Sequence, residues 1–408
     1  MTRASLREYL ATQRPRYRLA SRAERTRLLD EIVAVTQYHR KAAIRRLREL
    51  PRPRASGAPV GRPRRYGPAV TAAAQVLWEA AGQIGAKRLQ PFVPDLLERL
   101  TACGELALPQ ETAQLLRQAS VATLERLLAP ARRTMPSRRR ATTQPGTWLK
   151  HQIPIRTFTE WDDARPGFLE VDLVAHCGGY SAGFYLYTLC AVDVATGWVE
   201  LQALWGKGQY RVGAGIHEIS RRLPVRLLGL DSDNGSEFIN RPLYDYCLRE
   251  GITFTRSRAY KKNDGAHVEQ KNGAIVRHLV GYDRYTSKAA YAQLARVYRL
   301  LRLHTNFFQP VQRLVHKTRH GARVHRVHDR AQTPFQRLCA AGVLPSDIRQ
   351  ELETLYHSLN PLHLRRQIDA ELASLWRLAA LEPARSSQAT GFNSPPGSQP
   401  FEAGSSVR

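Results

Sequence analysis

Three acidic residues stand where a carboxylate is explained best by a bound cation. Asp172 interrupts the apolar run Phe168–Ala175, which predicts a strand, and a carboxylate buried unpaired in a sheet costs several kcal/mol. Asp233 follows a later predicted strand at an Asn-Gly turn, and Glu269 lies on a predicted helix after 35 intervening residues. Because Mg²⁺ and Mn²⁺ prefer oxygen ligands, we expect these three carboxylates to bind divalent metal.

Other polar residues near these positions offer alternatives. Asp231 shares a strand face with Asp233 and is the other candidate ligand, although its place within the strand favours Asp233. Asp193 precedes a Thr-Gly turn and is expected to stabilise that hairpin. Glu237 could reach phosphate or metal, but a solvated turn carboxylate is the favoured interpretation. His267 either lines the site or packs elsewhere.

The elements expected around these residues alternate in type. Strands are predicted at Phe168–Ala175, Gly183–Val194, Trp198–Leu204, Val225–Asp231 and Ile252–Thr255, and helices near 208–223, at Arg241–Glu250 and over about 264–280. Three antiparallel strands followed by alternating helices and strands indicate a mixed α/β sheet flanked by helices.

Residues 166–280 resemble the catalytic domain of the retroviral integrase superfamily, which includes the DDE transposases of bacterial insertion sequences. The matching features are Asp172 in an apolar strand, the Asp-Asn-Gly-Ser-Glu-Phe turn that begins at Asp233, Asp193-x-x-Thr-Gly197, and Glu269 followed by Asn272. The resemblance implies a ribonuclease-H-like core with a five-stranded mixed sheet, spanning about residues 166–285.

This resemblance also implies a chemistry. Asp172, Asp233 and Glu269 would hold two Mg²⁺ or Mn²⁺ ions, which stabilise the attacking and leaving oxygens of an in-line displacement at phosphorus. The expected reaction is 3′-end cleavage at terminal inverted repeats, followed by strand transfer into target DNA. Basic and amide residues near Glu269 would contact DNA: Lys261, Lys262, Lys271, Asn272 and Arg277.

The overall charge fits a polyanionic partner. The chain has 62 Lys and Arg against 35 Asp and Glu, a formal net charge of +27. Residues 1–50 read as helical, with a capping box at Ser21 and Glu24 and a basic second helix, and we expect a helix-turn-helix that binds DNA. Its expected DNA contacts are Arg40, Lys41 and Arg45.

The remaining regions are assigned from composition and periodicity. Residues 51–68 form a basic Pro/Gly/Arg linker that resembles an AT-hook, with Arg62 and Arg64 as expected DNA contacts. A second helical DNA-binding domain is expected at 69–131, a basic linker at 132–165, and a mainly helical DNA-binding or multimerisation region at 286–382, which includes a basic hairpin. The tail 383–408 is expected to be disordered.

Several classes of function are disfavoured. The five cysteines are scattered without zinc or disulfide spacing, and the sequence contains no signal peptide or apolar run of membrane-spanning length. We therefore expect a bacterial cytoplasmic, nucleoid-associated protein that acts as a dimer or higher multimer on double-stranded DNA, without a membrane or a small-molecule substrate. The alternatives are a helix-turn-helix regulator with an inactive integrase-like domain, or a ribonuclease-H-like nuclease.

Overall fold

The computed structural model describes residues 3–48, 65–134, 165–233, 235–256, 266–321 and 323–380. These belong to two compact units, Met1–Arg65 and Tyr66–Arg408, each of which is described by itself.

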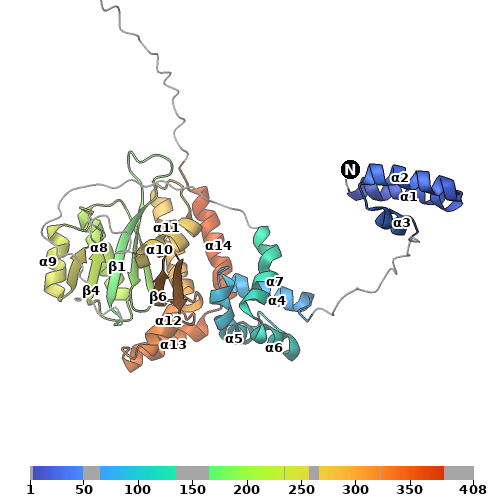
Figure 1. Ribbon diagram of the computed structural model, residues 1–408. Coiled ribbons are helices and arrows are strands. Elements are labelled where there is room, and N and C mark those ends of the chain that lie inside the picture. The colour runs from blue at the N-terminus through green and yellow to red at the C-terminus, as the bar shows by residue number, and fades with distance from the viewer. Residues whose placement is uncertain are drawn as a thin grey trace, which may run out of the picture. The chain divides into compact units, whose positions relative to one another are not determined.

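The first unit is made of three helices, α1 (Arg3–Leu19), α2 (Arg22–Thr36) and α3 (Arg40–Arg48), drawn in blue in Figure 1. The predicted capping box at the start of α2 is confirmed, because Ser21 accepts a hydrogen bond from the Glu24 backbone and the Glu24 side chain accepts one from the Ser21 backbone. The predicted pair of helices is preceded by α1, whose Leu10 and Tyr17 join the small core of this unit.

A five-stranded mixed sheet lies at the centre of the second unit, as expected. Its strands are β1 (Phe168–Ala175), β2 (Tyr187–Asp193), β3 (Val199–Leu204), β4 (Gly229–Ser232) and β5 (Thr253–Arg256), in the order β3-β2-β1-β4-β5. The pairs β1–β2 and β2–β3 are antiparallel, and β1–β4 and β4–β5 are parallel. The prediction for β1 matches the structure residue for residue, whereas the expected second and fourth strands begin four residues too early.

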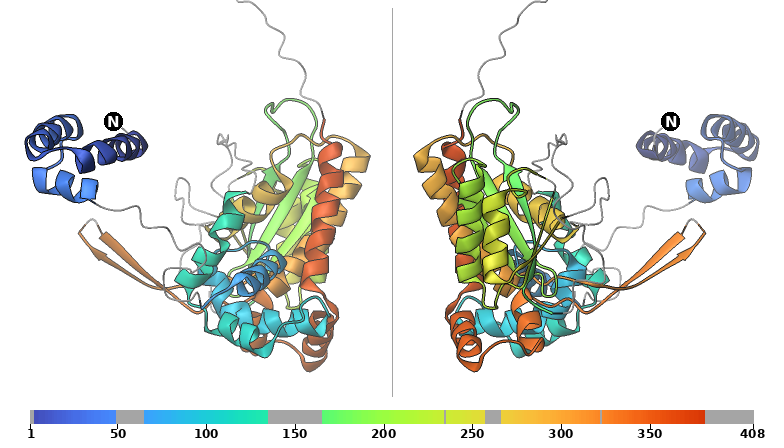
Figure 2. Two further views of the ribbon diagram at one scale, coloured as in Figure 1. Left: turned by 90° about the vertical axis from the view of Figure 1, so that its right-hand side faces the viewer. Right: turned by 90° about the vertical axis from the view of Figure 1, so that its left-hand side faces the viewer.

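Helices cover both faces of this sheet (Figures 1 and 2). The helices α8 (Gln209–Arg222) and α9 (Arg241–Glu250) pack on one face, against the odd-numbered residues of β1 such as Leu169 and Val171. The opposite face is covered by α10 (Ala266–Lys271), the π-helix η1 (Asn272–Val280) and α11 (Lys288–Phe308). The strands alternate their side chains between these two layers, which is why Asp172 faces the α10 side.

The helices that were expected to form a second DNA-binding domain pack into this same unit. They are α4 (Pro68–Ala80), α5 (Ala86–Ala102), α6 (Gln110–Gln118) and α7 (Val121–Arg133). Pro68 begins α4, and the Ser120 side chain caps α7. Their apolar side chains share one core with α11 and with α14 (Pro361–Arg377). Arg99 of α5 donates to the backbone carbonyl of Leu359 at 2.8 Å. The described part of 69–131 is therefore continuous with the core.

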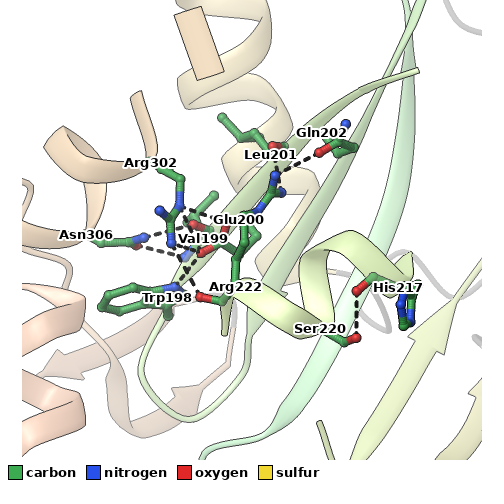
Figure 3. Close-up of polar contacts among 10 residues, drawn as sticks. All are labelled: Trp198, Val199, Glu200, Leu201, Gln202, His217, Ser220, Arg222, Arg302 and Asn306. Carbon is green, nitrogen blue, oxygen red and sulfur yellow. Dashed lines mark hydrogen bonds and ion pairs between the residues drawn. The ribbon is translucent and has the colours of Figure 1, made fainter. Parts of the chain in front are cut away.

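A buried charge network joins the edge strand β3 to two helices (Figure 3). The Glu200 carboxylate is fully buried and accepts hydrogen bonds at 2.9–3.1 Å from the Arg302 guanidinium of α11. The Trp198 indole donates to it at 3.0 Å, and Arg222 of α8 lies 3.4 Å away. The charges of Arg222 and Arg302 compensate the burial of the Glu200 carboxylate. Because these residues come from α8 and α11, the network holds both helices to β3.

The aromatic segment Asn306–Pro310 predicts a break after the preceding helix, but α11 continues through Asn306 and ends at Phe308, inside that segment. Asn306 both accepts from and donates to the Val199 backbone at 2.8 Å, as Figure 3 shows. It thereby satisfies polar groups of β3, which is the edge strand of the sheet in the described part of the chain. Phe307 and Phe308 are buried in the core as the last two residues of the helix.

The chain after α11 forms a hairpin and three helices. The expected basic hairpin is confirmed as β6 (Leu314–His320) and β7 (Arg323–His328), which project from the body in Figure 2. The helices are α12 (Pro334–Ala340), α13 (Ser346–Ser358) and α14, and Thr333 and Gln336 form a capping box at the start of α12. None of the described helices is long and apolar enough to cross a membrane. The predicted tail 383–408 lies outside the described residues.

Candidate active site

The register of the sheet places Asp172 and Asp233 next to each other. The parallel pair β1–β4 ends with Val171 opposite Ser232, and Asp172 and Asp233 are the next residue of each strand. The strand β4 ends at Ser232, whereas β1 continues to Ala175. Asp172 therefore lies beside the loop that follows β4 and begins with Asp233. The carboxyl ends of parallel strands are the usual position for a site in an α/β sheet.

The loop after β4 favours Asp233 over Asp231 as a site residue. Asp231 is buried and accepts a hydrogen bond from the Thr255 hydroxyl at 2.7 Å, so it links β4 to β5. Asp233 is exposed, and its carboxylate accepts from the backbone of Gly235 at 2.9 Å. A Cβ added to Gly235 would lie 2.9 Å from Asp233 and 2.7 Å from Glu237, so glycine allows both carboxylates to approach the same turn.

Glu170 ties the helix of Glu269 to the strand of Asp172. Its buried carboxylate accepts hydrogen bonds from the backbone amides of His267 and Val268, at 2.9 and 3.1 Å. These amides lie in the first turn of α10, where amides have no partner within the helix. Glu170 and Asp172 are two residues apart on one face of β1. Capping by Glu170 therefore fixes the position of α10 and its exposed Glu269 relative to Asp172.

Asn272 makes a second connection between the helix and the strand. Its side-chain amide donates to the Asp172 carboxylate at 2.7 Å, and its own carbonyl oxygen is buried without a hydrogen-bond partner among the described residues. Asn272 is also the first residue of η1, and π-helical turns are frequent at functional sites. The structure thus places Asn272 in the carboxylate cluster.

Burial and neighbouring carboxylates raise the pKa values of Asp172 and Asp233. The pKa of Asp172 is raised from 3.8 to about 7, first by burial and then by the charges of Asp233, Glu269 and Glu237. The pKa of Asp233 is also raised, first because the surrounding protein partly desolvates its carboxylate and then because the charge of Glu237 is close. The charge of Lys207 opposes this shift. Mutual repulsion of this kind is relieved by a bound cation.

The donor set fits a hard divalent cation. The acidic side chains here offer only oxygen ligands: Asp172, Asp233, Glu237 and Glu269. The pKa values of Asp172 and Asp233 are raised. Within the described ranges, no three Asp, Glu, His or Cys side chains already stand close enough together to hold one metal ion. Asp172 instead accepts from Asn272 and Leu173, both at 2.7 Å.

The basic residues expected near Glu269 have different surroundings. Lys271 is buried, and burial together with the charge of Arg88 lowers its pKa to about 8. Arg277 donates to the carbonyl of Ala175 at 3.0 Å and stacks over Tyr282. Both side chains are therefore engaged within the protein. Lys261 and Lys262 lie outside the described residues.

The other expected DNA contacts belong to the N-terminal region. Lys41 and Arg45 are in α3 of the first unit, where Arg40 also pairs with Asp30. Arg62 and Arg64 lie outside the described residues. Asp193 has the structural role expected of it, since its carboxylate accepts hydrogen bonds from Gly167 and Thr196, each at 2.7 Å.

Two residues near the site were not recognised from the sequence, and a third, Glu237, was considered but not favoured. Glu170 has a sequence signal, because it is a second carboxylate within the apolar strand, two positions before Asp172. Glu237 was expected to be a solvated turn carboxylate rather than a group that reaches phosphate or metal, and its charge contributes to the raised pKa values of Asp172 and Asp233. Lys207, exposed between two glycines, has no pattern that distinguishes it from other surface lysines.

Comparison with known proteins gives one substantial relative. The chain is 44% identical over 311 residues to the uncharacterized protein y4rM of Sinorhizobium fredii, which covers 76% of this chain and 88% of that protein. No family model matches the chain.

Solved structures are similar at a lower level. The BIV integrase catalytic core domain is 20% identical with a TM-score of 0.29, over 43% of this chain and 95% of that one. The HTLV-2 integrase catalytic core domain in complex with magnesium is 19% identical with a TM-score of 0.23, over 28% of this chain and 70% of that one. At these scores the similarities carry no argument about function.

Proposed function

The chain belongs to the same family as the y4rM protein of Sinorhizobium fredii, and we propose that it is a metal-dependent DNA transposase. It would bind the terminal inverted repeats of a mobile element, cleave their 3′ ends and transfer the freed strands into target DNA. The single observation that supports this proposal most is the raised pKa of Asp172, which is caused by burial and by the charges of Asp233, Glu269 and Glu237.

Each carboxylate comes from a different element, which gives the site its shape. Asp172 comes from the central strand, Asp233 from the loop after β4, and Glu269 from a helix that Glu170 holds in place. Such a set needs long-range folding to assemble, and it leaves repelling charges together in the folded chain. An uncharged set would fold with less repulsion. A catalytically inactive domain would therefore have no use for these three charged residues.

The proposed metal ligands are Asp172, Asp233 and Glu269. Bound Mg²⁺ or Mn²⁺ would supply charge stabilisation to an in-line displacement at phosphorus and lower the pKa of bound water. Two hydrogen bonds orient these carboxylates: the Asn272 side-chain amide donates to Asp172, and the Gly235 backbone amide donates to Asp233. Glu237 lies close enough to Asp233 to extend the set.

The chain's charge supports DNA as the substrate. A net charge of +27 favours a polyanion, and Lys207 places a cation beside Asp233. We further propose that the first unit selects the element ends through its basic helix α3, that the protein acts as a multimer, and that it works in the bacterial cytoplasm at the nucleoid. A regulator with an inactive integrase-like domain and a ribonuclease-H-like nuclease remain the competing functions.

The test is cleavage of a duplex made from the DNA that flanks the gene. We expect nicking at the end of a terminal repeat in Mg²⁺ or Mn²⁺ and none in EDTA. Asp233→Asn and Glu269→Gln should lower the rate by at least about a thousandfold, because loss of a metal ligand removes several kcal/mol of transition-state stabilisation.

A matched control removes an acidic residue away from the site. Glu218→Gln deletes one exposed carboxylate of α8 that pairs with Arg221, and it should leave the rate unchanged. Full activity of Asp233→Asn or Glu269→Gln would contradict the assignment of these residues. Repeat-specific binding without any cleavage by the wild-type protein would favour the regulator, and cleavage without joined products would favour the nuclease.

A further inference from the structure

The β6–β7 hairpin is a basic ribbon without acidic residues. Residues 314–328 contain four Lys or Arg and four His, and no Asp or Glu. A surface with both signs of charge is the normal condition for a soluble protein. The composition of this hairpin therefore favours a partner that carries negative charge.

The hairpin is exposed along its length. Each strand packs mainly against the other, and Figure 2 shows the pair extending away from the body. Arg319, Arg323 and Arg326 are exposed, and in the described part of the chain none of the three forms an ion pair. Apolar side chains are exposed there as well, with Val315 at 67% and Val327 at 41%. Packing against the described hydrophobic cores therefore does not account for these exposed side chains.

The pairing register sets charged groups on both faces. Arg319 lies opposite Val324, and Arg326 belongs to the same face because it is two residues from Val324. The other face carries Arg323, which lies opposite His320. A ribbon with cations on both sides can meet two rows of anions at once.

The base of the hairpin is held firmly. The Asp329 carboxylate accepts from the Arg313 backbone at 2.7 Å and pairs with Arg337 of α12 at 2.8 Å. Arg337 also donates to the carbonyl of Val311 at 2.9 Å. The ribbon is therefore anchored to the second unit at its base, while its arms remain open to solvent.

We propose that the β6–β7 ribbon binds double-stranded DNA by lying in its major groove. This groove is wide enough for a two-stranded β-ribbon, and its two phosphate rows match cations on both faces. Seven residues of strand span about 23 Å, roughly two-thirds of one helical turn of DNA. The inference rests on the proposed function only in taking a DNA duplex as the substrate.

The test compares two triple variants of the full-length protein. Arg319→Gln/Arg323→Gln/Arg326→Gln removes three charges from the ribbon. Arg221→Gln/Arg249→Gln/Arg349→Gln removes three from exposed helix positions, whose side chains are 68%, 69% and 53% exposed. Fluorescence anisotropy measures binding to a 30-base-pair duplex without divalent metal, over a series of salt concentrations. The wild type and both variants should have the same thermal unfolding temperature.

The ribbon variant should lose affinity and salt dependence together. Each phosphate contact contributes about 0.9 to the slope of log K against log salt, so the slope should fall by about 2.7 and the affinity on the order of a hundredfold at 0.1 M salt. The helix variant should retain most of both. Equal losses in the two variants would overturn the proposal, since net charge alone would then explain them.

Two further outcomes separate this inference from its alternatives. Unchanged DNA binding with a change of oligomeric state in light scattering would contradict the proposal and assign the ribbon to contacts between copies. Ribbon-dependent DNA binding by a protein that cleaves no DNA in Mg²⁺ would contradict the proposed function and support the ribbon inference. Binding is measured without metal, so the two proposals fail separately.

Discussion

Replacing Asp172 with asparagine should stabilise the protein when no metal is present. The pKa of Asp172 rises from 3.8 to about 7 on folding, because burial and the charges of Asp233, Glu269 and Glu237 disfavour its ionised form. Keeping it ionised above pH 7 therefore opposes folding by up to about 4 kcal/mol. Asp172→Asn removes this charge, and the carbonyl oxygen of Asn272, now without a partner, can accept from the new amide.

The stability difference between Asp172→Asn and the wild type should grow as the pH rises. Stability from this group is fully present below pH 3.8 and is lost as the pH rises through about 7, so the variant's advantage should be about 2–4 kcal/mol at pH 8 and below about 2 kcal/mol at pH 5. Urea unfolding in EDTA measures it by tryptophan fluorescence, because all six tryptophans belong to the second unit. Mg²⁺ should stabilise the wild type and not the variant. Equal stability at pH 8, or an advantage that does not shrink at pH 5, would refute the reasoning.

Three further predictions concern positioning and stability. Glu170→Ala should lower the cleavage rate about tenfold or more at unchanged DNA affinity, because α10 loses its cap, and Glu170→Gln should restore part of the rate; equal rates for both would count against a positioning role. Glu200→Gln should destabilise the protein by about 3 kcal/mol or more in urea, since Arg302 loses its charged partner, whereas Glu353→Gln at an exposed pair should cost less than about 1 kcal/mol. Burial lowers the pKa of His176 to about 3, so stability should fall as the pH drops from 6.5 towards 3, and His176→Gln should make the measured slope less steep.

The sequence predicted the elements of the core well because their periodicities are strong. The strand Phe168–Ala175 and the helix Arg241–Glu250 match the structure at both ends. Errors arose where a local signal was outweighed by tertiary contacts. Asn306 and the aromatic residues after it looked like a break, yet they continue α11 because Asn306 bonds the edge strand and Phe307 and Phe308 are buried.

The sequence singles out Asp172, Asp233 and Glu269, but it does not predict the contacts that surround them. Asp172 and Asp233 become neighbours through the parallel register of β1 and β4, which single-sequence patterns do not specify. Glu170 caps a helix nearly 100 residues away in the chain, and Asn272 bonds Asp172 across 100 residues. The same limit applies to residues 69–131, whose helical pattern was clear but whose apolar faces pack against α11 and α14.

Strand transfer by the purified protein tests the central claim most directly. A duplex already cut at the 3′ end of its terminal repeat is incubated with plasmid DNA and Mg²⁺, and joined products are separated on a gel. The account predicts joined products with the wild-type protein, none in EDTA, and none with Glu269→Gln, although that variant should bind the duplex with unchanged affinity. Joined products from Glu269→Gln at the wild-type rate would contradict it.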